Sequence, residues 1–236
     1  MHYPRTRALA FLALLIPGST LAGSLTVAPV APESLAFARY IASIHRPDPF
    51  TESRPVSLVI EASLPASGKE IRAIAVREIG ESERSEYTVL QSEGDQAVMQ
   101  EVIAPYLAEL KKIEDLPLSS VIVTPANYKF RFIGKIGTEE YLFRIVPKKK
   151  RAGLIRGELW IDSATGAAVM QAGHFVKTSS AGIRRMEMVR DTKLQDGAPR
   201  SRVTRVRFET PGAGRGYLTI TEFPSAAART VASAGE

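Results

Sequence analysis

The sequence predicts a mainly β protein with added helices, an α+β fold built on one curved antiparallel sheet of about ten strands. Short runs of β-favouring residues recur between residues 56 and 222, and glycine-containing or polar turns separate most of them. Turns this short join antiparallel neighbours. Two other segments repeat apolar residues every three or four positions, which predicts helices. Because a wide open sheet tends to curl, we expect the helices to cover its apolar face.

The first 22 residues have the organisation of a cleavable secretion signal. Arg5 and Arg7 precede an apolar run at residues 8–16 that is too short to span a bilayer. A Pro-Gly pair ends that run, and the sequence Thr-Leu-Ala at 20–22 supplies the small residues that a signal peptidase recognises. The basic residues in front and the helix-breaking pair behind argue against an N-terminal core helix. We therefore expect an exported protein, cleaved after Ala22.

The composition excludes several classes of site. The chain has no cysteine, so it has no disulfide, thiolate nucleophile, cysteine metal site or lipidated N-terminal cysteine. Cleavage leaves 29 basic and 25 acidic residues, a mild net charge of +4 that is spread along the chain, and nucleic acid is not an expected partner. The length suits a single domain, placed at residues 33–223 between a linker at 23–32 and a flexible tail at 224–236.

The first half of the chain combines helices and strands. Residues 33–45 and 95–113 carry apolar residues at helical spacing. Pro105 lies in the middle of the second segment and is expected to kink or split that helix, because proline removes a backbone hydrogen bond. Strands are expected at residues 56–64, 70–79 and 87–91.

The second half is almost entirely β. Strands are expected at residues 120–124, 128–136, 140–147, 155–162, 168–177, 183–194, 202–210 and 216–222. Turn pairs such as Asp196-Gly197 lie between them and indicate hairpins. The glycine-rich segment 212–216 superficially resembles a phosphate loop, but it joins two of these strands and opens no helix. It is interpreted as a hairpin turn.

Catalytic and metal chemistry have little support in the sequence. His45 and His174 are the histidines that remain after cleavage, and neither has metal-ligand spacing or an adjacent nucleophile motif. The carboxylate pairs Glu114-Asp115 and Glu139-Glu140 lie near predicted turns or helix ends, where we expect solvation. We predict no enzyme activity, no catalytic residue, no metal and no cofactor. A hydrolase would need a histidine, a carboxylate and a serine in one pocket.

Two features allow more than one interpretation. The basic run Lys148–Arg151 could contact anionic lipid headgroups, but a solubilising hairpin tip is the favoured explanation. Trp160 could line a cavity. Its neighbours Leu159 and Ile161 point to the other side of the same strand, so this strand is apolar on both faces and core packing is the simpler interpretation.

Three successive segments resemble the outer-membrane lipoprotein-sorting superfamily (LolA/LolB-like). They are Tyr141–Lys150, a strand ending in a proline and basic residues, then Arg156–Asp162, and then Ala168–Gln171. The middle segment, Arg-Gly-Glu-Leu-Trp-Ile-Asp, matches the superfamily's pattern of glycine, any residue, hydrophobic, tryptophan, hydrophobic, aspartate. The similarity extends over residues 127–222, and the helix expected at 33–45 matches the superfamily's opening helix.

The resemblance implies an unclosed β-barrel capped by helices, whose apolar interior takes the acyl chains of a lipid or lipoprotein in the periplasm. On that basis we expect a non-enzymatic carrier or chaperone, monomeric, with a membrane-bound donor or acceptor as a further partner. The alternative is a periplasmic sensor or protein-interaction domain of the same fold with a filled core. The candidate ligand-binding residues are Phe130, Phe132, Leu142, Trp160, Ile161, Val169 and Phe175.

Overall fold

The structure is a computed structural model that describes residues 31–46, 48–50, 55–79, 85–177, 185–210 and 214–224. The predicted signal peptide, residues 23–30 of the predicted linker and the chain after Pro224 lie outside these residues. Within the described part, none of the helices has both the length and the apolar character that crossing a membrane requires. The fold is therefore described from Ala31 onward.

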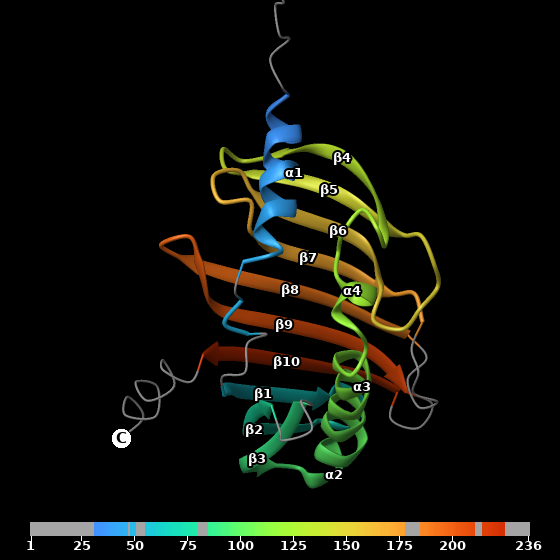
Figure 1. The fold of residues 1–236 in the computed structure, drawn as a ribbon. Helices are drawn as coiled ribbons and strands as arrows, with labels where there is room; N and C mark the ends of the chain where they lie inside the picture. The colour runs from blue at the N-terminus through green and yellow to red at the C-terminus, as the bar shows by residue number, and fades with distance from the viewer. Residues whose placement is uncertain are drawn as a thin grey trace, which may run out of the picture. The chain divides into compact units, whose positions relative to one another are not determined.

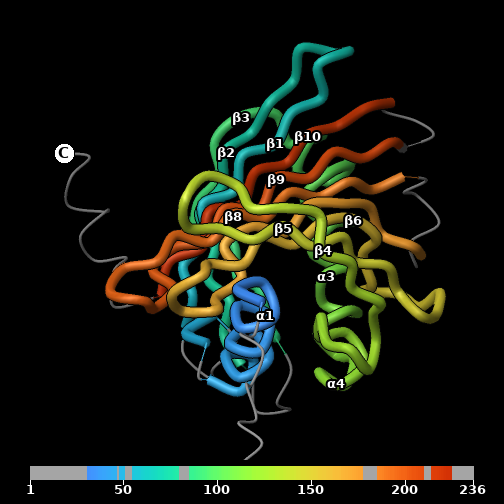
Figure 2. The backbone as a smooth tube through the Cα atoms, turned by 90° about the horizontal axis from the view of Figure 1, so that it is seen from above, coloured from blue at the N-terminus to red at the C-terminus, as the bar shows by residue number. Residues whose placement is uncertain are grey.

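One antiparallel sheet of ten strands dominates the described residues (Figure 1). Its order is β3-β2-β1-β10-β9-β8-β7-β6-β5-β4, so β3 and β4 are the two edges and the sheet is unclosed. The sheet is curved, as Figure 2 shows. The predicted fold class, mainly β with α on a curved unclosed sheet, is confirmed. The strands are β1 (Val56–Leu64), β2 (Lys69–Ile79), β3 (Ser85–Gly94), β4 (Tyr128–Ile136), β5 (Glu140–Pro147), β6 (Ile155–Asp162), β7 (Ala168–Phe175), β8 (Arg185–Gln195), β9 (Ala198–Thr210) and β10 (Gly214–Pro224).

Most predicted strands have the predicted bounds to within a few residues, but the strand expected at 120–124 is wrong. A short helix, α4 (Leu118–Val121), occupies that place. Its carbonyl groups have partners outside the sheet: the Asn127 side-chain amide donates to Ser119 O and Ile122 O, at 2.8 and 3.0 Å. These hydrogen bonds come from a residue only eight and five positions along the chain, and they stabilise a helical turn where the valines and the isoleucine favour a strand.

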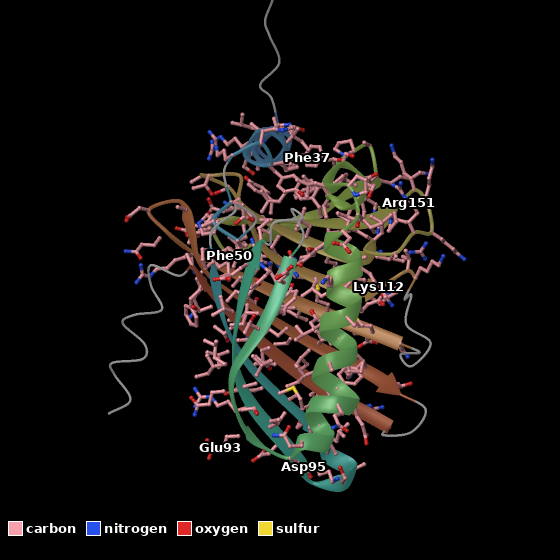
Figure 3. All side chains as sticks on the ribbon, turned by 60° about the horizontal axis from the view of Figure 1, so that its bottom comes forward. Phe37, Phe50, Glu93, Asp95, Lys112 and Arg151 are labelled. Atoms are coloured by element: carbon pink, nitrogen blue, oxygen red, sulfur yellow. The ribbon has the colours of Figure 1, made fainter. Side chains whose placement is uncertain are left out.

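The helix expected at 95–113 is present and begins with a capping aspartate. Asp95 Oδ1 accepts a 2.8 Å hydrogen bond from Ala97 N, and α2 (Gln96–Val98) continues through the π-helical segment η2 (Met99–Ile103) into α3 (Ala104–Glu114). Figure 3 labels Asp95 at its start and Lys112 near its end. Pro105 follows the π segment, as predicted for a residue that interrupts the regular helix.

The helices pack on one face of the sheet, which we call the inner face, and form two separate apolar clusters with it (Figures 1 and 2). The helix α1 (Pro32–Ser43) packs on β4, β5 and β6 through Ala36 and Tyr40. The helix η2–α3 packs on β1, β2, β8, β9 and β10 through Val102, Ile103 and Tyr106. The centre of the inner face lies between these two clusters.

Candidate functional site

An aromatic cluster fills the space between α1 and the edge of the sheet. The ring centroids of Phe37 and Phe130 are 4.8 Å apart in an edge-to-face arrangement, and Phe37 and Phe143 are 5.5 Å apart. Phe132 extends the cluster along β4, 5.5 Å from Phe143. Its members are Phe37, Tyr40, Tyr128, Phe130, Phe132, Tyr141 and Phe143.

The aromatic cluster is buried at its centre and open at its edge. Phe143 is 5% exposed, whereas Phe132 is 40% exposed, and Phe37 and Phe130 are half-buried. β4 is an edge strand, so within the described part of the chain no strand lies beyond Phe132. Apolar rings left open beside a buried aromatic centre are a surface to which an apolar ligand can bind.

Polar contacts hold α1 over this cluster from two sides. The Tyr40 hydroxyl donates a 2.6 Å hydrogen bond to Val123 O, and burial raises the pKa of that hydroxyl, so it stays protonated. Ser43 Oγ donates to Gly166 O at 3.1 Å. Gly166 lies so close to α1 that a Cβ there would be 2.4 Å from the Arg39 carbonyl carbon. The helix is thus fixed to the β6–β7 turn and to the segment after α4.

A polar strip separates the two apolar clusters on the inner face. The pairing register of the strands aligns one row of side chains across this strip. The row consists of Leu159 on β6, Gln171 on β7, Arg190 on β8 and Thr204 on β9. Leu159 and Thr204 are buried, but Gln171 and Arg190 between them remain partly exposed. The helices therefore cover the two sides of the inner face more completely than its centre.

Charged side chains surround one side of this strip. Arg77 contacts Glu114 at 3.2 Å and Glu222 at 3.7 Å, and these carboxylates raise the pKa of Arg77 although burial acts to lower it. The Tyr87 hydroxyl donates to Glu114 at 2.8 Å. Sequence analysis expected Glu114 to be solvated, which is wrong. The Glu114 carboxylate lies between α3 and β2. The residues around Glu114 in the sequence do not show that these two elements are in contact.

Arg202 belongs to the same inner-face region. Its guanidinium contacts Asp48 at 2.9 Å and lies over the Phe50 ring, 4.5 Å from the centroid. Burial raises the pKa of the nearby Tyr106 hydroxyl to about 12, so Tyr106 is neutral. None of these groups has the geometry of a nucleophile with an adjacent base.

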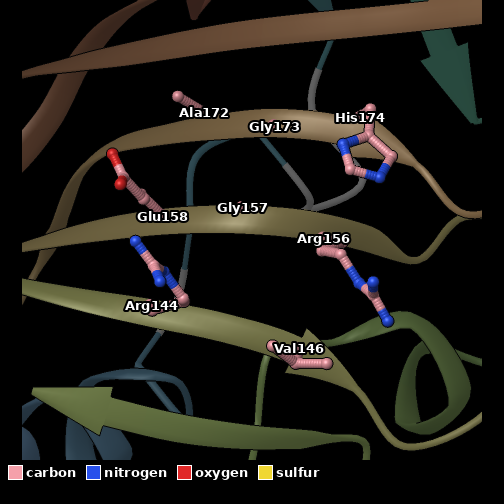
Figure 4. A pocket seen from close by; sticks show the side chains of 8 residues that line it. All are labelled: Arg144, Val146, Arg156, Gly157, Glu158, Ala172, Gly173 and His174. Atoms are coloured by element: carbon pink, nitrogen blue, oxygen red, sulfur yellow. The ribbon is translucent and has the colours of Figure 1, made fainter.

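The outer face of the sheet holds a shallow pocket of about 580 Å³ over β5, β6 and β7 (Figure 4). Gly157 and Gly173 are direct partners in its floor, and the guanidinium groups of Arg144 and Arg156 lie beside them. Neither arginine has a carboxylate within 4.0 Å among the described residues. The remaining lining residues are Val146, Glu158, Ala172 and His174.

The structure places the sequence-predicted ligand residues on both faces of the sheet. Phe130, Phe132 and Ile161 lie on the inner face beside α1, and Phe175 lies on the inner face against the cluster under η2–α3. Leu142 and Trp160 alternate with inner-face residues and pair with each other on the outer face. Val169, half-buried, occupies a register shift between Ala168 and Met170. That all seven residues line one ligand cavity remains a prediction.

Sequence reasoning missed several aromatic members of the cluster under α1 and also the polar residues of the inner face. Gln171, Arg190 and Arg202 occur in strands with no motif, and only their register brings them together. The alternation of Met186, Met188 and Arg190 along β8 is the signal that could have placed Arg190 on the apolar face. His174 lies exposed in the outer pocket, and no group of three metal-ligating side chains occurs in the part of the chain that the structure describes.

Comparison with known proteins adds a distant likeness to a solved structure. No protein-family model matches the chain, and no curated protein matches it. The chain is similar to a LolA superfamily protein from Nitrosomonas europaea, with 13% sequence identity, a TM-score of 0.34 and coverage of 81% of this chain and 92% of that one. That protein carries the name of the superfamily that the segment Tyr141–Gln171 resembles. At this identity and TM-score, nothing about the ligand or partners of this chain follows from it.

Proposed function

We propose that the mature chain is a non-enzymatic carrier or chaperone that works in the periplasm and binds a lipid or a lipoprotein acyl chain on the inner face of its sheet. The observation that carries this proposal is the aromatic cluster under α1, which is open at Phe132 and half-buried at Phe37 and Phe130. The predicted secretion signal and the motif at Tyr141–Gln171 support the same assignment.

The first experiment is native mass spectrometry of the protein purified from the periplasm, followed by extraction and identification of bound lipid. We expect a protein mass that begins at Gly23 and a second species that carries a lipid or an acylated peptide. A ligand-free mass, combined with no uptake of the neutral apolar dye Nile red, would contradict the carrier function.

A matched pair of variants locates the binding surface. Phe132→Gln removes a 40% exposed ring from the inner face, and Tyr217→Gln removes a 41% exposed ring from the outer face of β10. Because burying an aromatic side chain contributes about 1.5–3 kcal/mol, we expect Phe132→Gln to weaken Nile red binding about tenfold or more. Tyr217→Gln should bind like the wild type. Equal effects of the two substitutions would place the dye elsewhere.

A second candidate function is a sensor or protein-interaction domain of the same fold. The outer pocket favours it, because Arg144 and Arg156 lie there without a carboxylate partner among the described residues, beside a floor of two glycines. An acidic side chain of a partner protein would fit these charges. Co-purification of an acidic protein that is lost on Arg156→Gln, with no lipid in the preparation, would favour this function over the carrier.

A further inference from the structure

Arg190 is a cation on the apolar side of the sheet whose charge is not matched by a direct contact. It follows Met186 and Met188 along β8, and both methionines are buried in the apolar cluster under η2–α3. Its Nε donates a 3.2 Å hydrogen bond to Thr204 Oγ1. Among the described residues, no carboxylate lies within 4.0 Å of its guanidinium nitrogens.

The neighbouring carboxylates are already engaged with other arginines. Glu114 and Glu222 both contact Arg77, and Asp48 contacts Arg202. Burial lowers the pKa of Arg190, and repulsion by Arg202 lowers it further, while Glu222 and Asp48 act in the opposite direction from a longer distance. A guanidinium in this position costs free energy unless water or an anion contacts it.

The row of inner-face residues that contains Arg190 changes from apolar to polar along its length. Register aligns Phe132, Phe143 and Leu159 with Gln171 and then Arg190, one residue from each of the five strands β4 to β8. Four strand spacings of about 4.8 Å separate Phe132 from Arg190, or about 19 Å, which suits a long-chain amphiphile measured from its head to the end of its chain. Gln171 and Arg190 remain partly exposed at the polar end, and Phe132 is 40% exposed at the apolar end.

We propose that Arg190 binds the anionic headgroup of an amphiphile whose acyl chain lies along the row from Leu159 to Phe132. This inference rests on the proposed carrier function and adds the ligand class, a lipid with a carboxylate or phosphate head. Phe143 and Leu159 are 5% and 1% exposed, so α1 has to release its hydrogen bonds to Val123 and Gly166 before the chain can lie against them. The guanidinium supplies charge-assisted hydrogen bonds to the head, and Gln171 lies beside it as a further donor.

The test compares an acid with an alcohol of the same chain. Oleate and oleyl alcohol are each titrated against the protein loaded with Nile red, and their displacement constants are measured. Because a hydrogen bond to a charged group adds about tenfold or more in affinity, we expect oleate to bind at least about tenfold more tightly than the alcohol. Arg190→Gln should remove this preference and leave alcohol binding unchanged, and Arg190→Lys should retain most of the preference.

A control variant and the remaining outcomes keep the test decisive. Arg207→Gln removes an arginine from the outer face of β9, where Arg207 pairs with Glu187, and should leave the ratio of the two constants as in the wild type. Equal affinities of wild type for acid and alcohol, or an unchanged preference in folded Arg190→Gln, would overturn the assignment of Arg190. If neither compound binds and Nile red is not taken up, the carrier function itself fails. If Arg190→Gln does not fold, the ratio of the oleate and oleyl alcohol constants is compared between the wild type and Arg190→Lys. That comparison then decides whether Arg190 binds the head.

Discussion

At the residue scale, two glycines determine how closely β6 and β7 can approach. Gly157 and Gly173 are direct register partners, and a Cβ on Gly157 would lie 1.9 Å from Ala172 O and 2.6 Å from Gly173 Cα. No rotation of a side chain relieves a clash with backbone. Gly157 belongs to the segment that resembles the superfamily pattern, and the close approach of the two strands gives a physical reason for glycine at that position.

Gly157→Ala is therefore expected to lower the free energy of unfolding by at least about 2 kcal/mol, because the two strands must separate to admit one methyl group. Urea denaturation followed by circular dichroism measures this change. The control is Gly134→Ala in β4, where a Cβ would meet nothing within 4 Å. That substitution should change stability by less than about 0.5 kcal/mol. Similar losses for both variants would show that the strand contact is not the cause.

At the element scale, the helix that runs from α2 to α3 depends on its first residue for its position. Asp95 accepts a hydrogen bond from Ala97 N and lies 3.3 Å from Lys69 of β2, so it joins the helix start to the sheet. The backbone hydrogen bond and Lys69 lower the pKa of Asp95 below its usual value of 3.8. The carboxylate thus stabilises the fold above that value, and its contribution is lost as the pH falls through the lowered pKa.

Asp95→Asn keeps a capping side chain but removes this charge. We expect the variant to melt at a lower temperature than the wild type between pH 5 and pH 7, since the ionised carboxylate is the better acceptor. The two melting temperatures should converge towards pH 2. Glu93→Gln, an exposed position two residues earlier on β3, should follow the wild-type profile. A constant difference between Asp95→Asn and wild type at all pH values would exclude the charge as the cause.

Most elements could be predicted from the sequence because their signals are local. Period-two alternation and turn residues define β4, β5 and β6 at the predicted bounds. The helix containing Pro105 was also predicted, although the π segment that accommodates the proline was not. The false strand at 120–124 shows the limit, since its β-branched residues satisfy a strand pattern while Asn127 bonds the carbonyls of a short helix instead.

The candidate site could be predicted only in part, because the face of a strand is a tertiary property. β6 is apolar on both sides, so the sequence could not tell whether Leu159 or Trp160 faces the helices. The structure places Leu159 inside and Trp160 outside, beside Leu142. The sequence also did not place Arg190 on the inner face. A charged residue is expected on the solvent side, and only the register of β7, β8 and β9 places it between the apolar clusters.

At the scale of the whole molecule, the sheet joins strands from the two halves of the chain. β1 pairs with β10 over eight residues from Val56↔Pro224 to Ser63↔Tyr217, and the β1–β3 meander reaches the rest of the sheet through this pairing. Contacts so distant in sequence close a long loop, which costs entropy and slows folding. The apolar cluster under η2–α3 draws residues from β1, β2, β8, β9 and β10 together, so its completion depends on the last strand.

Two truncations test this dependence. A chain that ends at Thr210 lacks β10, which removes Leu218 and Ile220 from the core and separates β1 from β9. We expect it to show no cooperative unfolding transition, because each Leu or Ile lost from a core costs about 2–5 kcal/mol and a domain has only about 5–15 kcal/mol in total. A chain that ends at Pro224 keeps every described strand and should unfold at the wild-type urea midpoint. If the chain ending at Thr210 still unfolds cooperatively, β4 to β9 form an independent unit and the β1–β10 pairing is not the step that completes the fold.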